Sequence, residues 1–260
     1  SSDSGTGPFY VASQDGTELR ANQKYRTGKP TIDRIVIRPY ASVRAAWADM
    51  LRSQVDMVYE IGSDAFDLLQ PASATKVFTF PRPYAYVLVF NVRRPSLKDA
   101  DFRRELNNAF DRDGFVNKAL DGHGRPATSP VWPDHWAMSV DSARFQYAPR
   151  SVASSGVHPP ITLLYSDPSH ERMALFVQQQ LQAVGVTVQL ELSSVCEAIT
   201  RAAAGNFDMW VADMGLGRSF LRQYLFWHTG SPYNWGNYSN PRVDAALDDI
   251  RQARNDDDYK

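Results

Sequence analysis

A strand–helix–strand pattern in the second half of the chain restricts most strongly how this sequence can fold. Residues 161–165 form a short apolar run, and residues 186–192 form a second one. The segment between them begins after Asp167 and Pro168, carries apolar residues at helical spacing and ends at Gly185. Two strands that are joined by one helix run parallel, with a right-handed crossover. The pattern therefore predicts an α/β fold whose sheet is at least partly parallel.

Further apolar patterns predict strands and helices on both sides of this unit. The other expected strands are residues 7–12, 18–21, 32–38, 55–59, 76–80, 86–90 and 207–213, the first two forming a hairpin. The other expected helices are residues 42–52, 64–69, 100–111, 115–120, 194–204 and 242–254. Ser42, Asp99, Asp111 and Asn240 stand where N-caps are expected. Together these elements predict mixed sheets covered by helices.

The bulk properties of the chain exclude several classes of function. The 260 residues are 43% hydrophobic and carry a net charge of -1, so no broad basic field is present to attract nucleic acid. No apolar run approaches the length that a bilayer requires. Residues 1–5 do not have the pattern of a signal peptide, although an exported protein can lose its signal peptide by processing.

The motifs of enzyme and metal sites are also missing from the sequence. The five histidines have no metal-ligand spacing, and Gly215 and Gly217 lie in a turn that lacks the third glycine of a dinucleotide fingerprint. No Gly-x-Ser-x-Gly motif is present. The single cysteine, Cys196, is read as a packing residue in preference to a reactive nucleophile. We therefore expect no catalytic residue, no metal site and no cofactor.

The strand at residues 207–213 supplies the first candidate ligand contacts. Asp213 stands at its end, after Trp210 and other apolar residues. The carboxyl ends of strands in an open α/β sheet face the crevice where ligands bind. Asp213 is therefore a candidate partner for a ligand ammonium group. The alternative is that Asp213 caps the following turn or pairs with Arg218.

Two aromatic loops supply the remaining candidates. Residues 234–241 include Asn234 and Trp235 and can form a cleft wall, or else a set of turns that leads into the last helix. Residues 132–136 hold two tryptophans, for which packing against a long surface segment is the alternative to ligand contact.

Short sequence motifs in a fixed order carry a family resemblance over nearly the whole chain. Residues 86–131 run from a buried strand through a charged turn and a helix to a Gly/Pro-rich loop. The other matching pieces are Gly-Thr-Gly-Pro-Phe at 5–9, the loop at 25–30, the strand and helix at 32–56, and Asn-Tyr-Ser-Asn-Pro at 237–241. In this order they resemble the family 5 extracellular solute-binding proteins of ABC importers, the oligopeptide- and dipeptide-binding type.

The resemblance implies an α/β fold of the two-lobe periplasmic-binding-protein type with mixed sheets, incomplete at both ends. Residues 1–90 would be part of lobe I, and residues 91–260 would be most of lobe II. The hinge between the lobes would lie at Phe90, Asn91 and Arg93.

The resemblance also implies what the protein does. It would capture a peptide or similar small solute between two lobes and deliver it to a membrane permease, at the periplasmic or extracellular face of the membrane. Its partners would be the solute and the permease, without nucleic acid, and it would meet the membrane only through the transporter or a lost lipid anchor. The expected ligand-binding residues are Asp213, Trp210, Arg218, Asn234 and Trp235.

One departure from the family pattern concerns the residue that anchors a peptide. Family members bind a peptide's amino group with an Asp that follows a Trp-x-x motif. Alignment backward from residues 219–221 assigns that role to Asp213, whereas alignment forward from residues 207–208 assigns it to Gly217. Two other classes also stay open: a hydrolytic enzyme that uses exposed carboxylates or His228, and a protein-interaction module that holds no small molecule.

Overall fold

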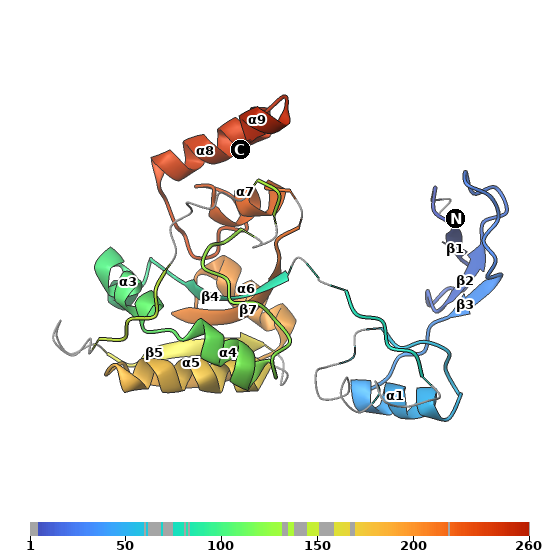
Figure 1. Ribbon diagram of the computed structural model, residues 1–260, viewed down its shortest axis with the longest axis horizontal. Coiled ribbons are helices and arrows are strands. Elements are labelled where there is room, and N and C mark those ends of the chain that lie inside the picture. Colours follow the sequence, from blue (N-terminus) through green and yellow to red (C-terminus); the bar gives the residue numbers. More distant parts are fainter. Residues whose placement is uncertain are drawn as a thin grey trace. The chain divides into compact units, whose positions relative to one another are not determined.

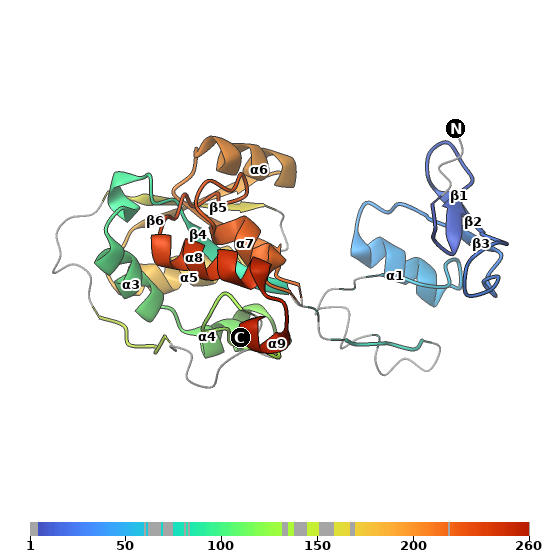
Figure 2. The same ribbon diagram turned by 90° about the horizontal axis from the view of Figure 1, so that it is seen from above.

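The computed structural model describes residues 5–59, 61, 69, 75–80, 82, 84–131, 135–137, 145–150, 159–166, 170–217 and 219–259. The chain divides into two compact units, Ser1–Phe78 and Thr79–Lys260. Both are visible in Figures 1 and 2. Among the described residues, no helix combines the length and the apolar character that crossing a membrane demands.

The smaller unit contains a three-stranded antiparallel sheet in the order β1-β2-β3. Its strands are β1 (Phe9–Val11), β2 (Glu18–Ala21) and β3 (Arg34–Val36). The expected hairpin is confirmed, since Tyr10 pairs with Arg20 across β1 and β2. Helix α1 (Val43–Leu51) follows, and the Ser42 hydroxyl accepts a hydrogen bond from the backbone N–H of Ala45, which confirms the predicted cap.

Two predicted strands of this region are wrong. Residues 55–59 and 76–80 have no strand conformation, and Met57 and Phe78 are 76% and 73% exposed. A short apolar run shows only that a segment is suited to a sheet. A strand also needs a neighbouring strand as a hydrogen-bond partner, and none is paired with these runs in the described part of the chain.

The larger unit is built on a four-stranded mixed sheet in the order β4-β7-β5-β6. Its strands are β4 (Tyr84–Phe90), β5 (Ile161–Ser166), β6 (Val188–Ser193) and β7 (Met209–Gly215). Strands β5, β6 and β7 run parallel, and β4 pairs antiparallel with β7. The predicted strand–helix–strand unit is confirmed as β5, α5 (Glu171–Ala183) and β6, and Figure 1 shows α5 lying along the sheet.

Helices cover both faces of this sheet. One face packs against α3 (Ala100–Asn108), α4 (Arg112–Ala119) and α5 through a buried apolar cluster. The other face packs against α6 (Val195–Ala204) and α7 (Leu221–Trp227). The other helices in the described part of the larger unit are η1 (Pro95–Leu97), α8 (Pro241–Gln252) and α9 (Asp256–Tyr259). Because side chains of a strand alternate between faces, β4, β5 and β7 contribute to both clusters, whereas β6 contributes only to the first.

The helix caps largely follow the predictions. The side chains of Asp99, Asp111 and Asn240 accept backbone hydrogen bonds at the starts of α3, α4 and α8. Helix α3 ends at Asn108, three residues earlier than expected, and α7 was not predicted. The predicted cap of α5, Asp167, lies outside the described residues, and the helix follows His170.

The division between the units differs from the boundary expected at residue 90. It lies between Phe78 and Thr79. Strand β4, expected at the end of lobe I, pairs with β7 from Tyr84 to Phe90 and belongs to the larger unit. The assignment of the units to lobes I and II remains a prediction.

Candidate ligand-binding site

The carboxyl edge of the larger sheet is the place where an open α/β fold offers a ligand site. Ser166 ends β5 and Ser193 ends β6 at this edge, and both side chains are buried. Because β4 runs antiparallel to β7, the amino-terminal residues of β4 lie at the same edge. The first residues of β4 therefore lie beside the last residues of β7 at this edge.

Tyr86 and Asp213 form a directly opposed cross-strand pair at this edge. Opposed residues of antiparallel strands have Cβ atoms about 4.5–5.5 Å apart and point to the same face. Tyr86 is 45% exposed, and Asp213 is also exposed. The next pair on this face is Tyr84 with Gly215, where a Cβ on the glycine would lie 3.5 Å from the tyrosine ring. The edge thus presents a carboxylate beside two aromatic rings.

His170 lies next to this pair. Its ring meets the ring of Tyr86 edge-on, with centroids 5.9 Å apart. Its Nδ1 is 2.8 Å from the carbonyl oxygen of Ser166, at the end of β5. His170 therefore connects the end of β5 to the exposed Tyr86 of β4.

Trp210 lies on the opposite face of the sheet from Asp213. The two residues are three positions apart on β7, so their side chains alternate to different faces. Trp210 is only 5% exposed, contacts Trp235 with ring centroids 5.2 Å apart, and donates from Nε1 to the Ser166 hydroxyl at 3.4 Å. The structure thus brings Trp210 and Trp235 together in the packing against α6 and α7, apart from Asp213.

The amide of Asn234 stabilises its own loop. Its Nδ2 donates to the carbonyl oxygens of His228 and Tyr238, and its Oδ1 accepts from the backbone N–H of Tyr238. Arg218 lies outside the described residues, as do residues 132–134 of the other aromatic loop. A ligand contact for Asn234 or Arg218 remains a prediction.

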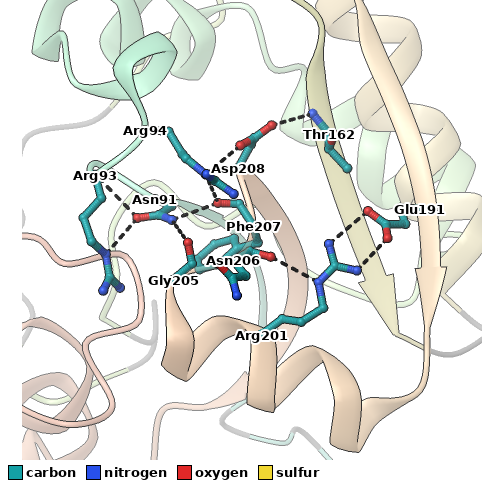
Figure 3. Close-up of polar contacts among 10 residues, drawn as sticks. All are labelled: Asn91, Arg93, Arg94, Thr162, Glu191, Arg201, Gly205, Asn206, Phe207 and Asp208. Atoms are coloured by element: carbon teal, nitrogen blue, oxygen red, sulfur yellow. Dashed lines mark hydrogen bonds and ion pairs between the residues drawn. The ribbon is translucent and has the colours of Figure 1, made fainter.

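The expected hinge residues lie inside the larger unit. Figure 3 shows the polar contacts of two of them, Asn91 and Arg93. Asn91 is fully buried, and its Nδ2 donates to the carbonyl oxygens of Gly205 and Phe207 at 3.0 and 2.8 Å. Its Oδ1 accepts from both the backbone N–H and Nε of Arg93, each at 3.2 Å. These contacts tie the end of β4 to the turn between α6 and β7. A hinge role for Phe90, Asn91 and Arg93 remains a prediction. The contacts of Asn91 instead favour an anchor, that is, a side chain that fixes the end of β4 to the turn between α6 and β7.

Charged residues hold the same turn from both sides (Figure 3). Arg94 pairs with Asp208 at 2.9 Å, and Asp208 also accepts from the backbone N–H of Thr162 on β5. On the other side Arg201 donates from Nε to the carbonyl oxygen of Asn206 in the turn and makes a bidentate ion pair with Glu191 of β6. Hydrogen bonds from Arg201 lower the pKa of the Glu191 carboxyl. The contacts of Arg94, Asp208 and Thr162 lie at the amino end of β5 and β7, away from the carboxyl edge, whereas Glu191 lies within β6.

Sequence reasoning named Asp213 but missed Tyr84, Tyr86 and His170. The alternation of Tyr84 and Tyr86 with small or aliphatic residues was a usable signal for an exposed face. Nothing local could show that Tyr86 lies opposite Asp213. In the described part of the chain, no group of three or more His, Cys, Asp or Glu side chains is arranged to hold a metal ion.

A mixed sheet with exposed aromatic and acidic side chains at its carboxyl edge is typical of an α/β ligand-binding protein. Residues 4–237 match the family described as bacterial extracellular solute-binding proteins, family 5 Middle. The chain belongs to the family 5 bacterial extracellular solute-binding proteins. The family resemblance and the α/β class with mixed sheets are thereby confirmed.

Individual relatives agree with this assignment. The chain is 25% identical over 260 residues to the probable D,D-dipeptide-binding periplasmic protein DdpA of Escherichia coli, covering 94% of this chain and 50% of that protein. The substrate-binding protein CtaP of Listeria monocytogenes superposes with a TM-score of 0.83 at 22% identity, covering 98% of this chain and 55% of CtaP. A dipeptide-binding protein of Pseudoalteromonas in complex with Met-Leu gives 0.83 at 16% identity, covering 97% and 54%. The chain therefore spans about half the length of these relatives.

Proposed function

We propose that this chain is part of the solute-binding component of an ABC importer, at the periplasmic or extracellular face of the membrane. It captures a peptide or a similar small solute and passes it to a membrane permease without chemical turnover. Family membership supports this proposal. It is also supported by relatives that are named for dipeptide and oligopeptide binding.

The observation that carries the proposal is the Tyr86–Asp213 pair at the carboxyl edge of the sheet. An exposed carboxylate beside an aromatic ring suits the amino group of a peptide, because the carboxylate accepts charged hydrogen bonds and the ring face attracts a cation. A hydrogen bond to a charged group contributes about 1.5–3 kcal/mol. Asp213 is therefore the contact that we expect to determine whether an amine binds.

Two other predicted contact residues, Trp210 and Trp235, act in this proposal by supporting the sheet and not by contacting the solute. Trp210 and Trp235 support the sheet from the face that carries α6 and α7. Ser166 joins the two faces, since its hydroxyl accepts from Trp210 and its carbonyl oxygen faces Nδ1 of His170.

Calorimetry with Met-Leu and with N-acetyl-Met-Leu tests the proposal. We expect saturable binding of Met-Leu, at least about tenfold weaker binding of the acetylated peptide, and a similar loss in Asp213→Asn. Asp249→Asn, which changes an exposed carboxylate on α8, is the matched control and should bind as the wild type does. Equal affinities of the wild type and Asp213→Asn would show that this edge does not bind the amine. Cleavage of the peptide during the titration would contradict a binding role without turnover.

A further inference from the structure

The hydrogen bond between His170 and Ser166 determines where the imidazole carries its proton. Nδ1 lies 2.8 Å from the carbonyl oxygen of Ser166. A carbonyl oxygen can only accept, so Nδ1 must be the donor. In the neutral ring the proton is therefore on Nδ1, and Nε2 carries a lone pair.

Nε2 has no hydrogen-bond partner among the described residues. Among the described residues, the His170 ring makes a polar contact with Ser166 and an edge-on contact with Tyr86. Within the described residues, the one fully enclosed side-chain polar atom that lacks a partner is Oε1 of Gln223. Nε2 of His170 is therefore not sealed inside the protein, although the residue as a whole is only 9% exposed. An acceptor that is held in place and partly accessible is suited to a ligand.

The position of His170 at the start of α5 also favours a role in ligand binding. N-cap side chains usually accept a hydrogen bond from the first turn of the helix. His170 makes no such bond, and its ring is instead held against the end of β5 and beside Tyr86. The ring is thus fixed next to the Tyr86–Asp213 pair without serving the helix as a cap.

We propose that His170 is a further ligand-binding residue, whose Nε2 accepts a hydrogen bond from an N–H group of a solute bound against Asp213 and Tyr86. This inference rests on the proposed function and deepens it. Asp213 supplies charge and His170 supplies a directed acceptor, so the site selects solutes that offer more than one N–H donor, as a peptide amino group does.

Two substitutions separate the roles of the two ring nitrogens. His170→Asn places an amide N–H near Nδ1 and retains the donor to Ser166, but it has no acceptor at the position of Nε2. His170→Gln places its amide near Nε2 and retains an acceptor there, but it loses the donor at Nδ1. We expect Met-Leu to bind His170→Asn about tenfold more weakly than the wild type, and His170→Gln to bind more tightly than His170→Asn. If His170 only stabilised the turn, the order of the two variants would be reversed.

Histidine ¹⁵N spectra of the unsubstituted protein provide a test that needs no variant. We expect a protonated Nδ1 and an unprotonated Nε2 for His170, with Nε2 shifting on titration with Met-Leu while Nδ1 stays in place. An Nε2 signal that does not move at saturation would overturn the assignment to His170 and leave the proposed function standing. Ethylammonium serves as a second probe, because it carries only the ammonium group that Asp213 is expected to bind. If the protein binds neither Met-Leu nor ethylammonium, both the proposed function at this edge and the role of His170 are wrong.

Discussion

Replacement of Asn91 by alanine should destabilise the larger unit more than any nearby polar substitution. Its side chain is fully buried and donates to the carbonyl oxygens of Gly205 and Phe207. Phe207 keeps a second donor, Nε of Arg94, whereas the described contacts give Gly205 no replacement. An orphaned buried acceptor costs about 1–3 kcal/mol, and the loss of a hydrogen bond whose partner stays satisfied costs about 0.5–1.5 kcal/mol. Arg93 loses Oδ1 of Asn91 as an acceptor, but Arg93 is exposed and can bond to water instead. We therefore expect the free energy of unfolding to fall by about 2–4 kcal/mol.

Urea unfolding followed by tryptophan fluorescence and by circular dichroism measures this loss. Asn206→Ala is the matched control, since Asn206 lies in the same α6–β7 turn, is exposed, and shows no side-chain hydrogen bond in the described structure. A surface substitution of this kind changes stability by about 0.5 kcal/mol or less. If Asn91→Ala were no more destabilising than Asn206→Ala, Asn91 would not be an anchor, and a hinge at this position would regain support.

Two further predictions concern the same turn. Gly205→Ala should destabilise the larger unit more than Gly230→Ala: both glycines have positive φ, 72° and 80°, but only at Gly205 would a Cβ lie 2.9 Å from the guanidinium carbon of Arg93. Thermal unfolding of the two variants gives the comparison, and equal shifts would show that the guanidinium moves aside freely. Glu191→Gln should reduce the loss of stability in acid, because hydrogen bonds from Arg201 lower the folded-state pKa of Glu191 below its ordinary value of 4.5. That contribution is present above the unfolded pKa and is lost as the pH falls through the folded pKa, and for so exposed a pair it should stay within about 1 kcal/mol. Unfolding curves measured from pH 6 downward should therefore be flatter for the variant, and parallel curves would contradict the role of the ion pair.

The sequence predicted those parts of the fold that depend on local chemistry. The strand–helix–strand unit from β5 to β6 followed from apolar spacing, and the caps at Asp99, Asp111 and Asn240 followed from side chains that bond to nearby backbone. The strand predictions at residues 55–59 and 76–80 were wrong because an apolar run does not reveal whether a pairing partner exists.

The candidate site was only partly predictable. Asp213 was found because an acidic residue near the end of an apolar strand is visible in the sequence. Trp210 was grouped with it, although the alternation of side chains along β7 places the two residues on opposite faces of the sheet. Tyr86 was missed as a site residue because its exposure depends on which strand lies next to β4.

The sequence by itself therefore determined the family, the α/β class and most of the helices, since motif order, residue spacing and capping are encoded within short segments. The tertiary structure alone decided that Tyr86 lies opposite Asp213, that the His170 ring contacts Tyr86, and that Asn91 bonds to residues more than a hundred positions away. Strand order and register are non-local: they arise when distant segments bury their apolar faces together, and no single segment contains that information.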